Sequence, residues 1–192
     1  MRVIITHVES QWPKTLAEWD NRDIPYPSTA SMNGGDSSNH LEPASTIIFA
    51  TEFGVPTILP AAFYMMAVTK GKPAEGDKIR PGRWDLLDAA TQVKVLEGRD
   101  AMRSYFIRAL SPLQYATCTN KCSSRGSIIA SNMLMEPEFY DGHSDCLEMF
   151  RTPSTKSSLG FVSCSICVAS YRKLGAEARV QFWSDLSIIF KL

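Results

Sequence analysis

Residues 58–68 read ILPAAFYMMAV, an apolar run without a charged side chain. A helix of this sequence is apolar nearly all round, so it belongs at the centre of a fold, enclosed by other elements. Pro60 is compatible with such a helix only in its first turn, where the missing N–H has no intrahelical partner to lose. The sequence therefore predicts a central helix over residues 57–68, more buried than any other element.

The C-terminal segment, from about Ser165 to Phe190, has the clearest helical periodicity in the chain. Its apolar residues step by three and then by four each time: Tyr171, Leu174, Ala178, Phe182, Leu186 and Phe190. This spacing places them on one face of a helix. We therefore predict one long helix over residues 165–190.

Similar patterns predict the remaining helices. Asp88 can cap a helix over 88–97, with Ala90, Val93 and Leu96 facing inward, and Gly98 should break it before a second helix over 99–110. Other predicted helices cover 41–54, ending at Gly54, and 128–135, and a short one follows Thr15, whose capping-box partner is Glu18.

No alternating strand pattern recurs along the 192 residues. The prediction is an all-α fold, an irregular helical bundle with a long C-terminal helix and a cysteine cluster. One domain should span residues 1–192, with loops at 21–40, 70–82 and 151–158, where Pro, Gly and Ser are frequent.

Charge and hydropathy exclude several classes of function. Twenty basic and twenty acidic residues cancel to a net charge of zero, which argues against an electrostatic nucleic-acid partner. The longest apolar run is too short to span a membrane, and no signal peptide precedes it. We expect an intracellular protein, in a reducing compartment where spaced cysteines bind metal more often than they form disulfides.

Four of the five cysteines form two closely spaced pairs, Cys118 with Cys122 and Cys164 with Cys167. Two thiol pairs far apart in the chain are typical of a tetrahedral structural zinc site, in which each pair supplies two ligands. The second pair lies at the predicted start of the last helix, where the helix N-terminus favours the thiolate that zinc binds. The sequence thus predicts a zinc ion that joins segments separated by residues 123–163.

Other interpretations of the cysteines stay open. They can be buried free thiols, a common environment for this residue. Cys146 or His143, three residues apart, can replace one of the four ligands. A thiol-redox protein using Cys164 and Cys167 is the rival function, but only about 25 residues follow Cys167, too few for the remaining strands of a thioredoxin-like fold.

The sequence contains no G-x-S-x-G, H-E-x-x-H or P-loop motif. His7, His40 and His143 are scattered, and capping explains Asp85 and Asp88 more simply than paired catalytic carboxylates do. The chain is therefore expected not to be an enzyme.

Several stretches resemble, in order and spacing, the region that follows the BTB/POZ domain in BTB proteins of mushroom-forming fungi. They are WPKTLAEWD (12–20), GVPTILPAAFY (54–64), LEGR (96–99), CSIC (164–167), EAR (177–179), FWSDL (182–186) and IFKL (189–192). The resemblance covers roughly residues 8–192, but segments 21–40 and 123–163 match poorly and the BTB fold itself is absent. It implies an intracellular helical module with an unidentified protein partner, in which the four paired cysteines act as a set.

Overall fold

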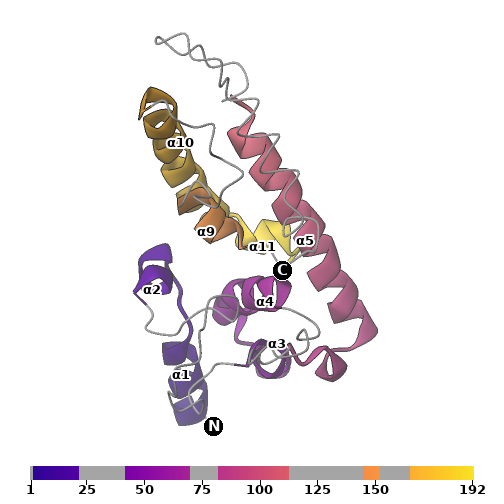
Figure 1. The fold of residues 1–192 in the computed structure, drawn as a ribbon. Helices are drawn as coiled ribbons and strands as arrows, with labels where there is room; N and C mark the ends of the chain where they lie inside the picture. The colour runs from indigo at the N-terminus through magenta and orange to yellow at the C-terminus, as the bar shows by residue number, and fades with distance from the viewer. Residues whose placement is uncertain (1, 22–41, 70–81, 113–144, 152–164) are drawn as a thin grey trace, which may run out of the picture. The chain divides into compact units, whose positions relative to one another are not determined.

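The structure is a computed structural model that describes residues 2–21, 42–69, 82–112, 145–151 and 165–192 (Figure 1). Within these ranges every regular element is a helix, which confirms the predicted all-α class. The α-helices are α1 (Arg2–Gln11), α2 (Leu16–Asp20), α3 (Pro43–Glu52), α4 (Leu59–Val68), α5 (Ala89–Leu110), α9 (Cys146–Arg151), α10 (Ser165–Ser184) and α11 (Leu186–Ile189). Short 3₁₀ helices are η2 (Pro56–Ile58) and η3 (Trp84–Leu86).

The predicted helix over 128–135 and nearly all of the predicted loops lie outside the described residues. Among the helices that are described, none is both long enough and apolar enough to cross a membrane.

The chain divides into two compact units. The first comprises residues 1–98 together with 186–192, and the second comprises residues 99–185. Helix α5 contributes its N-terminal part to the first unit and its C-terminal part to the second. The single domain over residues 1–192 stays a prediction.

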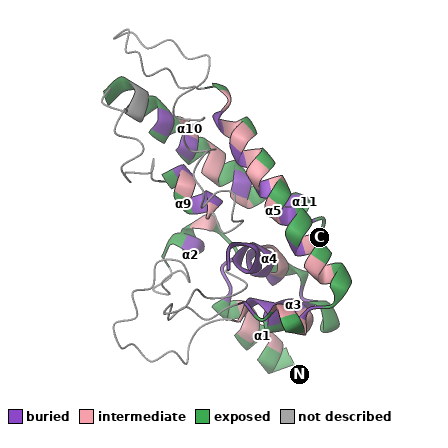
Figure 2. Cartoon of the chain, turned by 45° about the vertical axis from the view of Figure 1, so that its right-hand side comes forward, coloured by how far each residue is buried: buried purple, intermediate pink, exposed green. Residues whose placement is uncertain are grey.

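Helix α4 is the core of the first unit, as its apolar sequence predicts. Eight of its ten residues are buried, and it packs against α3 and α11 (Figure 2). Pro60 lies in its first turn, where it costs no hydrogen bond. The ring of Phe63 lies 5.6 Å from that of Phe190, and Tyr64 meets Trp19 edge to face at 5.2 Å.

Local capping signals in the sequence are realised in the structure. The Glu18 N–H donates to the Thr15 hydroxyl and the Thr15 N–H donates back to the Glu18 carboxylate, each at 3.2 Å, so the predicted capping box forms. Asp88 caps α5 by accepting the Thr91 N–H at 2.6 Å, a bond that lowers the pKa of its carboxyl group. Gly54, with a φ of 65°, follows the end of α3 and provides the predicted stop.

The predicted break at Gly98 is wrong, because α5 runs without interruption from Ala89 to Leu110. Gly98 is buried, and a Cβ atom at this position would collide with the ring of Phe190. The glycine is therefore explained by the close approach of an aromatic ring, and the packing outweighs the helix propensity that glycine lacks.

The predicted inward face of the first half of α5 is also wrong. Ala90, Val93 and Leu96 are exposed, whereas Val95 is fully buried. The reason is a contact between residues far apart in the chain. Phe190 packs on Gly98, and this contact turns the side of α5 that carries Val95 and Gly98 toward the core.

The C-terminal segment is two helices instead of one. Helix α10 ends at Ser184 and α11 begins at Leu186, with a turn at Asp185. After α11, Lys191 adopts a φ of 52°, and the Leu192 N–H donates to the carbonyl of Ser187 at 2.9 Å. This is a Schellman-type helix end with lysine in the left-handed position that glycine usually occupies.

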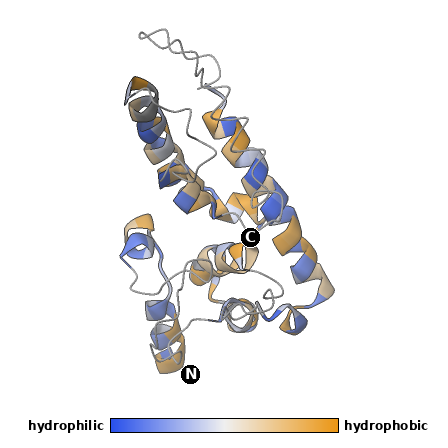
Figure 3. Cartoon of the chain, in the orientation of Figure 1, coloured by the Kyte–Doolittle hydropathy of each residue, from blue (hydrophilic) through white to orange (hydrophobic). Residues whose placement is uncertain are grey.

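The core of the second unit is aromatic. Phe150 of α9 lies between Phe106 of α5, at 4.9 Å, and Phe182 of α10, at 5.8 Å. Tyr171 of α10 is buried as well. On α5 and α10, apolar and polar segments alternate (Figure 3), as expected for helices that bury one side. Four of the six residues in the apolar stripe predicted for 165–190 are buried, and Leu174 and Ala178 are half-buried. Most of the predicted stripe is therefore confirmed.

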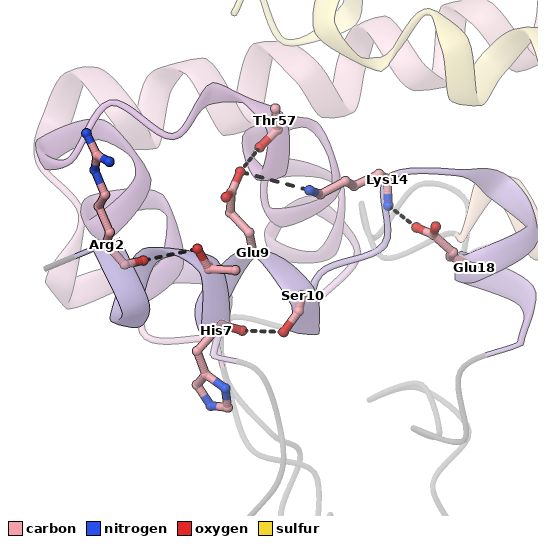
Figure 4. Close-up of polar contacts among 8 residues, drawn as sticks. Arg2, His7, Glu9, Ser10, Lys14, Glu18 and Thr57 are labelled. Atoms are coloured by element: carbon pink, nitrogen blue, oxygen red, sulfur yellow. Dashed lines mark hydrogen bonds and ion pairs between the residues drawn. The ribbon is translucent and has the colours of Figure 1, made fainter.

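Helix α1 has no predicted counterpart and no buried residue. A polar contact joins its end to η2: the Glu9 carboxylate accepts a hydrogen bond from the Thr57 hydroxyl at 2.8 Å and lies 3.9 Å from the Lys14 ammonium group (Figure 4). Because Lys14 and Thr57 are exposed and Glu9 is only half-buried, the contact orients α1 more than it stabilises the fold.

Candidate functional site

The structure describes little of the predicted zinc ligands. Cys118, Cys122 and Cys164 lie outside the described residues. Cys167 is within the first turn of α10, as predicted, although its side chain is not described. The convergence of the four sulfur atoms therefore stays a prediction.

Cys146, the proposed substitute ligand, is part of the core of the second unit. It begins α9, is 2 % exposed, and its Sγ atom lies 3.9 Å from the carbonyl oxygen of Met102. Burial, and secondarily the neighbouring charge of Asp145, raises the pKa of its thiol well above the usual value. In this structure its sulfur atom fills part of the core of the second unit. His143, the other substitute, lies outside the described residues.

Within the part of the chain that is described, no three His, Cys, Asp or Glu side chains come together in a group able to hold a metal ion.

Two hydrogen bonds and a closely packed glycine help to hold helix α10, whose first turn contains Cys167, against α9. The Tyr171 hydroxyl donates to the carbonyl of Met149 at 2.8 Å, and the Arg179 Nε–H donates to the carbonyl of Leu147 at 2.9 Å. Between them in sequence, Gly175 is buried against the backbone of Phe150. The two hydrogen bonds fix the orientation of α10, and the glycine sets its distance from α9.

We expect Gly175→Ala to destabilise the second unit. A Cβ atom at this position would lie 2.5 Å from the carbonyl oxygen of Phe150, and a backbone atom cannot move aside as a flexible side chain does. The two helices must separate, so the cost should resemble that of an overpacked core, about 1–3 kcal/mol, against the small gain that alanine normally brings to a helix. Chemical denaturation measures the change, with Ala176→Gly as a control for helix propensity. A Gly175→Ala chain more stable than the parent would contradict the close packing.

A second candidate site is an exposed apolar surface where α5 meets the C-terminal residues. The Lys191 ammonium group pairs with the Glu97 carboxylate at 2.7 Å and joins the two segments. Around this pair in sequence, Val93, Leu96, Ile188 and Leu192 are 52 %, 49 %, 76 % and 43 % exposed. We call these four side chains and the ion pair the C-terminal surface. The ion pair brings together the two segments that carry these side chains, and exposed apolar side chains that share one region are typical of protein interaction sites.

The C-terminal surface could not be found from the sequence pattern. Val93 and Leu96 have the spacing of core residues, which is why they are predicted to face inward. The contact between Gly98 and Phe190 decides which side of α5 is buried, and no pattern in the sequence indicates this contact.

His7, Glu9 and Ser10 are close in sequence on α1 and are residue types that hydrolases use, but the Glu9 side chain points away from the other two, toward Thr57 (Figure 4). The Ser10 hydroxyl, however, donates at 2.7 Å to the backbone carbonyl of His7, and the His7 ring contacts Gln11 at 3.1 Å. The Glu9 carboxylate instead contacts the Thr57 hydroxyl and the Lys14 ammonium group. A serine whose proton bonds to a carbonyl, instead of to an imidazole, is not activated as a nucleophile.

Comparisons of the chain with protein-family models, with curated proteins and with solved structures give no match.

Proposed function

We propose that this chain is a non-enzymatic protein-interaction module of intracellular type, similar to the region that follows the BTB domain in fungal BTB proteins and held by a structural zinc ion. The observation that supports an interaction role best is the C-terminal surface. Four large apolar side chains remain in water there, although the adjacent helix α4 and residues Ile189 and Phe190 are well buried. Covering these side chains with a partner would remove apolar area from water, which is favourable.

The proposed zinc ligands are Cys118, Cys122, Cys164 and Cys167. Cys146 lies in the core of the second unit beside Met102, which favours the two spaced pairs, and His143 stays an alternative ligand. Cys167 lies in the first turn of α10, where unpaired backbone N–H groups favour thiolate. The contacts of α10 with α9 would hold one half of such a site in place.

Metal analysis tests the zinc proposal. We expect protein purified under reducing conditions to contain about one zinc ion per chain, because a set of four thiolates completes a closed tetrahedral site. Extended X-ray absorption should give sulfur neighbours at about 2.3 Å. Protein that is folded and free of zinc, after purification without chelators, would show that the cysteines are ordinary thiols.

Binding experiments with the intact chain test the interaction surface. Ile188→Asp and Leu96→Asp place a charge within the C-terminal surface and should abolish the capture of partner proteins from cell extract. Val180→Asp is the matched control, because Val180 is 59 % exposed on α10, in the second unit. Equal loss of capture in all three variants, or in none, would contradict the assignment to this surface.

The rival function, thiol-redox activity at Cys164 and Cys167, has its own measurement. Zinc-bound thiolates are not available for disulfide exchange, so the proposed module should not reduce insulin. Insulin reduction that is lost in Cys164→Ser or Cys167→Ser would favour the redox protein instead.

A further inference from the structure

We draw no further inference here: the strongest candidate, the exposed apolar side chains of α5 and the C-terminal residues around the Glu97–Lys191 ion pair, belongs to the site already described, and nothing in the structure shows what covers it.

Discussion

A chain that carries both Cys164→Ser and Cys167→Ser is expected to purify without zinc and to unfold far more readily than the parent. Two of four ligands are removed, and serine does not replace thiolate at a zinc site. The apparent free energy of structural zinc binding in zinc-finger peptides is about 10–16 kcal/mol, and it acts as folding free energy because the site does not exist in the unfolded chain. The loss should therefore exceed that of any single core substitution. Zinc content and urea denaturation, measured on the same samples, check it.

Cys146→Ala is the matched control for this experiment. It removes a buried sulfur atom beside Met102 and should cost some stability through the cavity left behind. Because Cys146 is not among the proposed ligands, the variant should keep its zinc. Full zinc in the double serine variant, or zinc lost with Cys146→Ala, would refute the ligand set.

The second large effect is expected from Phe63→Ala. Phe63 is 3 % exposed on the most buried helix of the first unit, with its ring against Phe190 and the Lys94 ammonium group 5.9 Å from its centre. Truncation removes the transfer energy of the ring and leaves a cavity between α4 and the C-terminal residues, a combination that costs about 3–5 kcal/mol. The midpoint of chemical denaturation should fall accordingly.

Phe53→Ala provides the comparison for Phe63→Ala. Phe53 is 41 % exposed at the end of α3 and loses mainly its contact with Phe49, so its truncation should cost less than about 1 kcal/mol. Similar costs for the two substitutions would mean that α4 is not the centre of the first unit.

The features that the sequence predicts correctly depend on neighbouring residues. The capping box of Thr15 and Glu18, the Asp88 cap and the stop at Gly54 each require only a few adjacent residues. The central position of α4 follows from its sequence, because a helix that is apolar on all sides is stable only when other elements enclose it.

The errors occur where a distant contact decides the structure. Gly98 reads as a helix break, but Phe190, ninety-two residues later, fills the space above it and keeps α5 continuous. The same contact exposes Val93 and Leu96, which helical spacing alone would bury. The sequence does not predict helix α1, because none of its residues is buried and the helix therefore carries no clear pattern of inward positions. The proposed zinc site would also depend on contacts between residues far apart in the chain.

The first unit is discontinuous in the chain, and this has a consequence for the order of folding. During synthesis, residues 99–185 leave the ribosome before residues 186–192, which complete the first unit. Until Phe190 emerges, Phe63 lacks its aromatic neighbour and Gly98 is an uncovered glycine within a helix. The N-terminal segment must therefore wait, with apolar surface exposed, while the second unit is made. We infer that the first unit completes its packing only after residues 186–192 have been made, and that it exposes apolar surface until then.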